Sequence, residues 1–183
     1  MHPRTNELLN YLDSTRSALN EAIESVPPAR RSERPAPERW SVAEVLGHLN
    51  LVESRLSRSM ANWIDEARNT GLGPETEENT VLDSLNREGI ADRSRRVTAP
   101  GPVQPSATLD AEGAWAALQA SRAQLRAAFV SGDGLALNQI ERPHPFFGPI
   151  NLYQWMVFVG SHEARHTAQI REIAVELASQ GTG

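Results

Sequence analysis

The sequence contains no cysteine and no lysine among its 183 residues. Without cysteine there are no disulfides, no thiolate metal sites and no cysteine nucleophile. Because all 18 basic residues are arginine, Schiff-base chemistry and the phosphate-binding lysine of a P-loop are excluded as well. Any thiol that takes part in a reaction of this protein must therefore come from a small-molecule cosubstrate.

Long apolar runs and a basic stripe are also missing. No run of 18 apolar residues suggests a transmembrane helix, and the first ten residues lack the charged and apolar regions of a signal peptide. The net charge is −5, and the sequence shows no basic footprint of the kind that holds nucleic acid. We therefore expect a cytoplasmic protein with neither a membrane nor a nucleic acid as partner.

Strand signals are weak, since aromatic residues make up only 5% of the chain and no β-branched run alternates over a useful length. Three groups of prolines separate four proline-free segments with helical periodicity. The predicted helices span about residues 5–26, 42–69, 110–131 and 151–177. This pattern indicates an all-α four-helix bundle, a single domain over residues 1–183. The long connection between helices 2 and 3, residues 71–105, is expected to carry a short helix near residues 82–88 or to cover one end of the bundle.

Two helix starts carry capping signals. Ser41 is followed three residues later by Glu44, which makes a capping box at the start of the second predicted helix. Asn151 and Gln154 have the same spacing before the last one. Both helices should therefore begin at fixed positions, which also fixes the rotation of the residues that follow.

Three histidines form the candidate site. His162 and His166 are four residues apart on the inward stripe of the last predicted helix, so both imidazoles point into the bundle. His48 lies beside the apolar stripe of the second helix and supplies a third nitrogen. Three neutral imidazoles from two helices suit a divalent metal with coordination positions left open for water or substrate, as in a catalytic site.

Other polar residues near these stripes carry alternative interpretations. His162-Glu163-Ala164-Arg165-His166 matches the H-E-x-x-H helix of zinc peptidases, in which Glu163 would be the general base, but the downstream ligands of that pattern are missing. We favour a surface ion pair or an ion pair to another helix for Glu163, with a base or second-shell role as the alternative. Gln169 could hydrogen-bond a ligand histidine or simply line the edge of the helix. Arg122 is interpreted as an edge arginine whose charged head reaches solvent, in preference to a clamp for a substrate anion. His144, between two prolines, is expected at the mouth of the site or in a structural role.

The segments WSVAEVLGHLNLVE, HPFFGPINLYQW and HEARHTAQI, in this order, resemble the DinB-like superfamily. This superfamily includes bacillithiol transferases, mycothiol-dependent isomerases and proteins described as metal-dependent hydrolases. The resemblance implies a four-helix bundle whose metal is held by one histidine of the second helix and an H-x3-H pair of the last. His48, His162 and His166 fall on those positions. The implied metal is zinc, nickel, iron or manganese, many members are dimers, and DNA binding is not implied.

Three functions are compatible with these residues. The first is a metal-dependent hydrolase or low-molecular-weight-thiol S-transferase that acts on a small-molecule substrate, with a thiol as possible cosubstrate. The second is a non-catalytic metal or small-molecule binding module, and the third is a stress or interaction protein that has lost its chemistry. A homodimer is expected from the resemblance.

Overall fold

The computed structural model describes residues 1–95, 97–105 and 110–180. Four long helices dominate these residues: α1 (Pro3–Glu24), α2 (Val42–Asn69), α4 (Ala111–Val130) and α5 (Leu152–Gln180). Their bounds agree with the four predicted helices to within about three residues at each end. The predicted four-helix bundle is confirmed. In the described part of the chain, no helix combines the length and the apolar character needed to cross a membrane.

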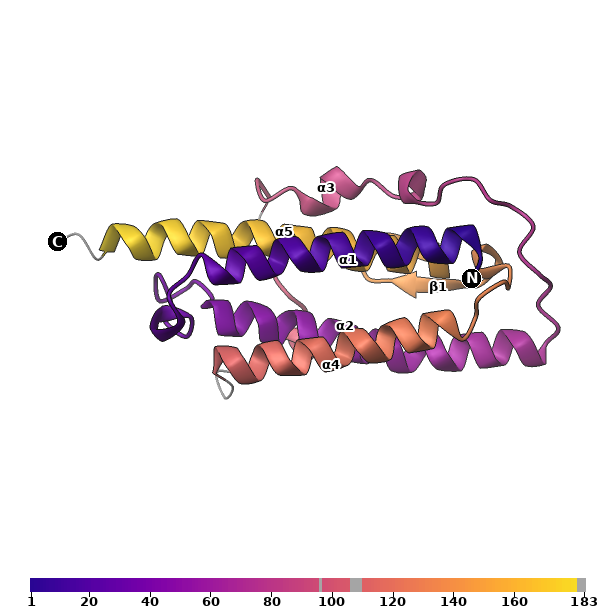
Figure 1. Cartoon of the computed structure of the whole chain (residues 1–183), viewed down its shortest axis with the longest axis horizontal. Coiled ribbons are helices and arrows are strands. Elements are labelled where there is room, and N and C mark those ends of the chain that lie inside the picture. Colours follow the sequence, from indigo (N-terminus) through magenta and orange to yellow (C-terminus); the bar gives the residue numbers. More distant parts are fainter. Residues whose placement is uncertain (96, 106–109, 181–183) are drawn as a thin grey trace.

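The four helices form two layers. Helix α1 packs mainly against α5, and α2 packs mainly against α4. Figure 1 shows the α1–α5 layer above the α2–α4 layer, with all four axes nearly aligned. Side chains that face the middle of the bundle can therefore meet from all four helices.

Local signals place the starts of α2 and α5. The Ser41 hydroxyl accepts a hydrogen bond from the Glu44 backbone N–H, and the Glu44 carboxylate accepts one from the Ser41 N–H. Asn151 and Gln154 exchange equivalent bonds of 2.9 and 3.0 Å. Both predicted capping boxes are present, and they set the helix rotations that turn the three histidines inward.

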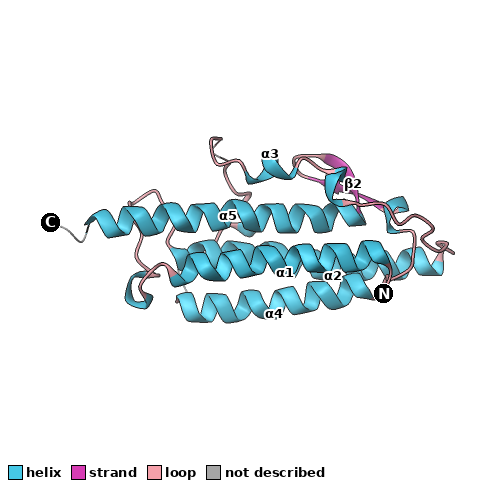
Figure 2. Ribbon diagram, turned by 45° about the horizontal axis from the view of Figure 1, so that its top comes forward, coloured by secondary structure: helices cyan, strands magenta, loops and turns pink. Residues whose placement is uncertain are grey.

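The first part of the long connection crosses the end of the bundle where α1 begins, as one of the two alternatives expected: the Glu75 N–H bonds to the Gly134 carbonyl, and Arg4 binds the Glu75 carboxylate. The rest of the connection runs along the side of α5 (Figures 1 and 2). It contains a 3-10 turn at Leu82–Ser84 and the short helix α3 (Arg87–Ala91). In place of one short helix near residues 82–88, the chain thus forms two short turns, and the α-helical one begins only at Arg87. Residue 96 of this predicted connection, and residues 181–183 of the predicted domain, lie outside the described residues.

A β-hairpin precedes α5 and departs from the prediction of helices without convincing strands. Strands β1 (Glu141–His144) and β2 (Gly148–Asn151) pair antiparallel, with Arg142 opposite Ile150 and His144 opposite Gly148. Gly148 has φ +70°, which a residue with a side chain adopts only at a cost. Four-residue strands that contain proline are too short to show an alternating pattern, so they carry no strand signal.

A polar layer crosses the bundle and divides its apolar core in two. One apolar cluster includes Leu12 of α1 and Val159 of α5, and the other includes Leu19 and Ile170 of the same helices. Between them lie polar side chains of all four helices, which are buried except for the half-buried Arg16: Thr15, Arg16, His48, Glu53, Ser121, Arg122, Glu163 and His166. The candidate site belongs to this layer.

Candidate metal centre

The three predicted histidines come together between the two helix layers. The Nε2 atom of His162 lies 3.2 Å from Nε2 of His48 and 3.1 Å from Nε2 of His166. One nitrogen from each of the three rings lies within 4.8 Å of the others. Because a metal–imidazole bond is about 2.0–2.1 Å long, two tetrahedral ligands sit ~3.3 Å apart. The spacing of these nitrogens therefore fits a single divalent ion.

Outer hydrogen bonds orient two of the rings. Nδ1 of His48 lies 2.7 Å from the carbonyl oxygen of Val103, and Nδ1 of His166 lies 2.8 Å from Oε1 of Gln169. A carbonyl oxygen only accepts, so each Nδ1 must carry the proton and each Nε2 presents a lone pair to the centre. Such a second shell is typical of metal-binding histidines. Of the two alternatives for Gln169, the structure has the hydrogen bond to a candidate ligand histidine.

Burial keeps the three imidazoles neutral. It lowers the pKa of His48, against a smaller opposing effect of the Val103 carbonyl. It holds the pKa of His162 and His166 well below the usual value, and the neighbouring imidazoles add to this effect. Neutral imidazole is the form that binds metals. The cluster contains no carboxylate among the described residues, so a bound ion would keep its full positive charge.

Aromatic rings cover two sides of the cluster. The Trp40 ring lies 5.1 Å from His48 and 6.3 Å from His166, nearly parallel to the latter. The Phe158 ring stacks on His162 at 5.2 Å. His48 and His166 are buried, whereas His162 is partly exposed. Of the three, His162 is thus the least buried.

His144 lies in the hairpin and not in the cluster. Its ring packs 4.4 Å from Phe158 and 4.7 Å from Phe147, and its Nδ1 accepts a hydrogen bond from the Phe146 N–H. Burial lowers the pKa of His144 to about 4. Since Phe158 separates it from His162, His144 belongs to the aromatic wall beside the site.

Glu163 does not face the histidines. Its carboxylate lies between the helices, where it accepts hydrogen bonds from Thr15 (2.8 Å), Arg16 (2.6 Å) and Arg122 (2.8 Å). The predicted ion pair to another helix is confirmed. Because its carboxylate is held by two guanidinium groups and a hydroxyl, Glu163 is not in position to act as the base of an H-E-x-x-H peptidase.

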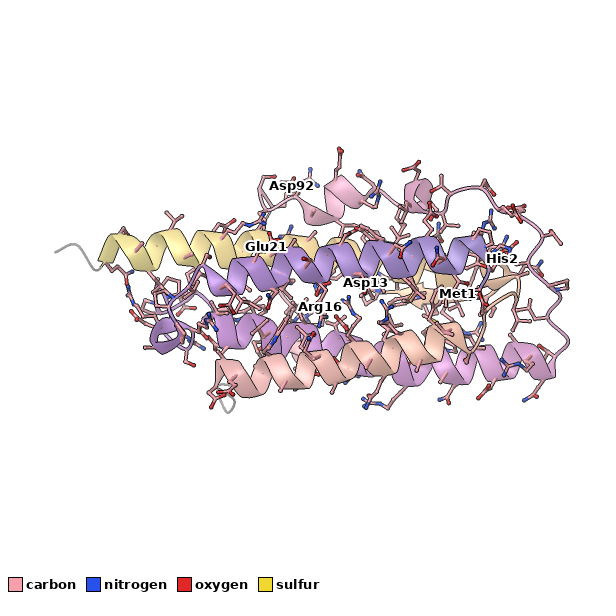
Figure 3. The ribbon with its side chains drawn as sticks, viewed as in Figure 1. Met1, His2, Asp13, Arg16, Glu21 and Asp92 are labelled. Carbon is pink, nitrogen blue, oxygen red and sulfur yellow. The ribbon has the colours of Figure 1, made fainter. Side chains whose placement is uncertain are left out.

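The structure corrects the expectation for Arg122. We expected an edge arginine that reaches solvent, yet it is only 6% exposed and binds Glu53 through two bonds of 2.7 and 2.8 Å. Arg16 joins the same carboxylate at 3.1 Å and lies between the helix layers in Figure 3. Burial works to lower the pKa of Arg122, but the hydrogen bonds and charges of Glu53 and Glu163 outweigh it and raise the pKa. The four groups balance in charge and join all four helices.

Apart from the ion pair of Glu163, this network was not predicted from the sequence, and neither was Val103 as the outer partner of His48. Glu53 follows two apolar residues on an amphipathic helix, and a charge beside the inward stripe is a signal that could have been found. Arg16 and Val103 carry no such signal, because their partners lie 37 to 147 residues away in the chain.

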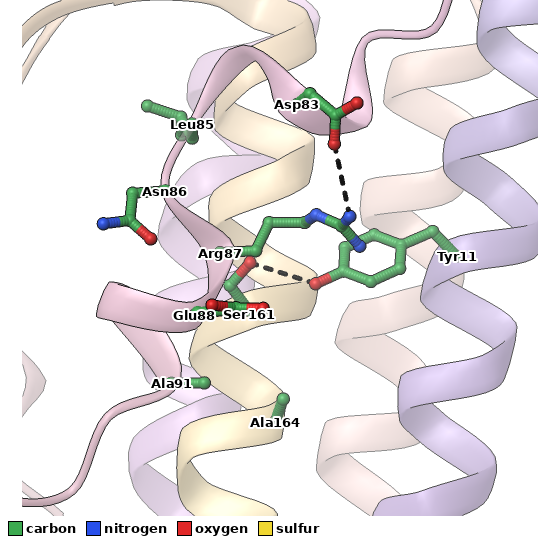
Figure 4. Close-up of a pocket in the computed structure, with 9 residues that line it drawn as sticks. All are labelled: Tyr11, Asp83, Leu85, Asn86, Arg87, Glu88, Ala91, Ser161 and Ala164. Carbon is green, nitrogen blue, oxygen red and sulfur yellow. Dashed lines mark hydrogen bonds and ion pairs between the residues drawn. The ribbon is translucent and has the colours of Figure 1, made fainter.

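The clearest hollows lie on the far side of α5 from the histidines. One, of about 420 Å³, is bounded by Tyr11 of α1, the segment around Arg87, and Ser161 and Ala164 of α5. In Figure 4 the Tyr11 hydroxyl meets Ser161 while Arg87 extends over the Tyr11 ring. The other shares Leu85 and Asn86 with the first and reaches Phe147 of the hairpin. Neither is lined by His48, His162 or His166.

Comparison with known proteins places this geometry in a family. A family model described as the DinB superfamily matches residues 11–170, which include all three histidines. The chain belongs to the DinB superfamily. A relative of this DinB protein, "Uncharacterized protein YuaE" of Bacillus subtilis (strain 168), is 29% identical over 149 residues, covering 80% of this chain and 84% of YuaE.

A solved structure shares the DinB fold seen here. The crystal structure of TT2238, a four-helix bundle protein, matches with a TM-score of 0.60 and 22% identity, covering 92% of this chain and 98% of TT2238. At this identity the likeness shows the fold alone. The three converging histidines are therefore interpreted from their own geometry.

Proposed function

We propose that this DinB protein binds one divalent metal ion through Nε2 of His48, His162 and His166 and uses it in a metal-dependent reaction of a small-molecule substrate. The observation that carries the proposal is the convergence of three neutral imidazoles, two of which are held by the carbonyl oxygens of Val103 and Gln169. Zinc, nickel, iron and manganese all suit the three nitrogens. Hydrolysis and transfer of a low-molecular-weight thiol are the reaction classes we propose.

Each part of the chain would have a defined role. A bound ion would supply Lewis-acid activation and lower the pKa of a water or thiol that it coordinates. His48 and His166 would stay fixed by Val103 and Gln169, and Phe158 would lie against the His162 ring. Trp40 would exclude water from the opposite side. The aromatic walls favour an apolar group next to the reacting centre.

A second candidate is a non-catalytic metal-binding module. It is favoured by the position of Glu163, the carboxylate closest to the histidines in the sequence, which is held by Arg16 and Arg122. A site without a positioned base can bind a metal without turning over substrate. Assays with thiol, amide and ester substrates on the metal-loaded protein separate the two candidates, because measurable turnover that is lost in His166→Ala excludes the module.

Elemental analysis tests metal binding itself. The untagged protein is compared with a variant in which His48, His162 and His166 are all alanine, before and after addition of zinc, nickel, iron or manganese salts. His144→Ala serves as the control, since it removes a buried histidine outside the cluster. We expect near-stoichiometric metal in the wild type and in the control and none in the triple variant. Equal, negligible metal in all three proteins after addition of each salt would refute the proposal.

A further inference from the structure

The amide of Gln169 can in principle sit in two orientations beside His166. With Oε1 toward the ring, Gln169 accepts the Nδ1 proton at 2.8 Å and leaves Nε2 free to bind a metal. With the amide turned over, its NH₂ group would donate to Nδ1, and the ring proton would move to Nε2. A proton on Nε2 blocks that nitrogen as a ligand. The orientation of one side-chain amide therefore decides whether His166 can bind.

Arg93 favours one of these orientations. Its Nη1 lies 3.4 Å from Oε1 of Gln169, and a guanidinium has donors only. The turned amide would bring its NH₂ group against Arg93, donor against donor. Glu172 holds the guanidinium in place with bonds of 3.1 Å to Nε and 2.8 Å to Nη2. Glu172 and Gln169 both lie on α5, whereas Arg93 comes from the connection between α2 and α4.

We propose that Arg93 is a positioning residue of the metal centre, which acts through Gln169 to set the His166 tautomer that binds metal. The inference rests on the proposed metal site. His48 needs no such helper, because the carbonyl of Val103 cannot turn over. Arg93 thus holds the Gln169 amide with its oxygen toward His166, just as the backbone holds the carbonyl oxygen of Val103 toward His48. Through these two residues, the connection fixes two of the three rings.

Two readouts test the role. In metal-free, ¹⁵N-labelled protein, two-bond proton–nitrogen spectra report which ring nitrogen of His166 carries the proton. We expect the Nδ1–H form in the wild type and a mixture with Nε2–H in Arg93→Ala. Competition titration with zinc chloride should show affinity about tenfold weaker in Arg93→Ala, within the range typical of lost outer partners. If Arg93 acted only through its positive charge, its removal would strengthen zinc binding. A weaker zinc affinity therefore indicates the tautomer role, and a stronger one indicates the charge effect.

A rescue and a control make the test specific. In Arg93→Ala combined with Gln169→Glu, either carboxylate oxygen can accept from Nδ1, so we expect the Nδ1–H form and the zinc affinity to return. Arg39→Ala is the control, since Arg39 also pairs with Glu172 (3.4 Å) but has its other ion pair with Glu176. It should change neither readout.

The outcomes distinguish this inference from the proposed function. If Arg93→Ala keeps the wild-type tautomer, or binds zinc as tightly as the wild type, the role of Arg93 is refuted while metal binding stands. A rescue that fails in a folded double variant also refutes it. If the wild type itself binds no metal, the proposed function fails, and the tautomer spectra still decide whether Arg93 sets the state of His166.

Discussion

Arg122 lies in the polar layer where all four helices meet, and its guanidinium binds two buried carboxylates. At the residue scale this arrangement makes the network sensitive to the loss of any one partner. A buried charge that loses its partner keeps its desolvation cost, and that cost exceeds the value of a surface ion pair.

Arg122→Ala should therefore destabilise the protein by about 3–5 kcal/mol, because it leaves Glu53 and Glu163 with only Arg16 to balance them. The control is Arg126→Ala, one turn further along α4, whose partner Asp13 is largely exposed. That variant should cost about 0–1 kcal/mol. Urea denaturation monitored by circular dichroism measures both. A similar, small effect for the two variants would contradict this interpretation of the network.

His144 should make stability fall in mild acid. Its folded-state pKa is lowered to about 4 by burial, so the unfolded chain binds the proton more tightly between pH 6.5 and 4. Stability is lost as pH falls through this window, by on the order of 1–2 kcal/mol between pH 7.5 and 5. His144→Phe, which keeps an aromatic ring in the wall, should lose less stability than the wild type over the same range. Parallel denaturation curves at the two pH values check this difference.

At the scale of elements, the packing of α1 against α5 depends on the absence of a side chain at Gly160, which lies against the Tyr11 ring. A Cβ atom placed there would lie 2.3 Å from Cε1 and 2.8 Å from Cδ1 of the Tyr11 ring. The Tyr11 hydroxyl is bonded to Ser161 at 3.0 Å, so the ring cannot move away without losing this bond. The glycine thus permits the spacing of α1 and α5 beside His162.

Gly160→Ala should destabilise the protein by about 1–3 kcal/mol, as overpacking does. Gly47→Ala is the matched control, since its Cβ would meet only Pro105 at an ordinary 3.7 Å. That change lies inside α2 and should be neutral or stabilising by up to about 1 kcal/mol. Thermal melts of both variants, and of Gly160→Ala combined with Tyr11→Ala, provide the test. The double variant should lose less stability than the sum of the two single changes, because removal of the Tyr11 ring relieves the clash. A loss equal to that sum would contradict the clash.

For the whole molecule, the proposed metal would join the two helix layers, because His48 lies on α2 and the other two ligands lie on α5. Such an ion binds the folded state only. At a free concentration of 100 times its Kd it adds about 2.7 kcal/mol to stability. For a chain of this size that corresponds to a rise in Tm of roughly 5–10 °C.

Differential scanning calorimetry with and without zinc chloride measures this shift. The variant with alanine at positions 48, 162 and 166 should show no metal-dependent change in Tm. A comparable shift in that variant would place the binding ion elsewhere in the protein.

The sequence alone determined the features that depend on local interactions. The starts of α2 and α5 follow from capping residues three positions apart, as at Ser41 and Glu44. The two hydrogen bonds between such residues form within one helical turn. The shared face of His162 and His166 follows from a spacing of four in a helix. For the same reason the four long helices and the three candidate ligands could be predicted before the structure was known.

Only the tertiary structure decided which distant groups meet. Arg122 and Glu53 are 69 residues apart, Arg93 and Gln169 are 76 apart, and Val103 and His48 are 55 apart. No local pattern encodes these pairs, because each depends on how the two layers and the connection pack. The same packing turned Arg122 inward and Glu163 away from the histidines. Spacing along the helices thus predicts the candidate ligands, and packing decides which groups contact them.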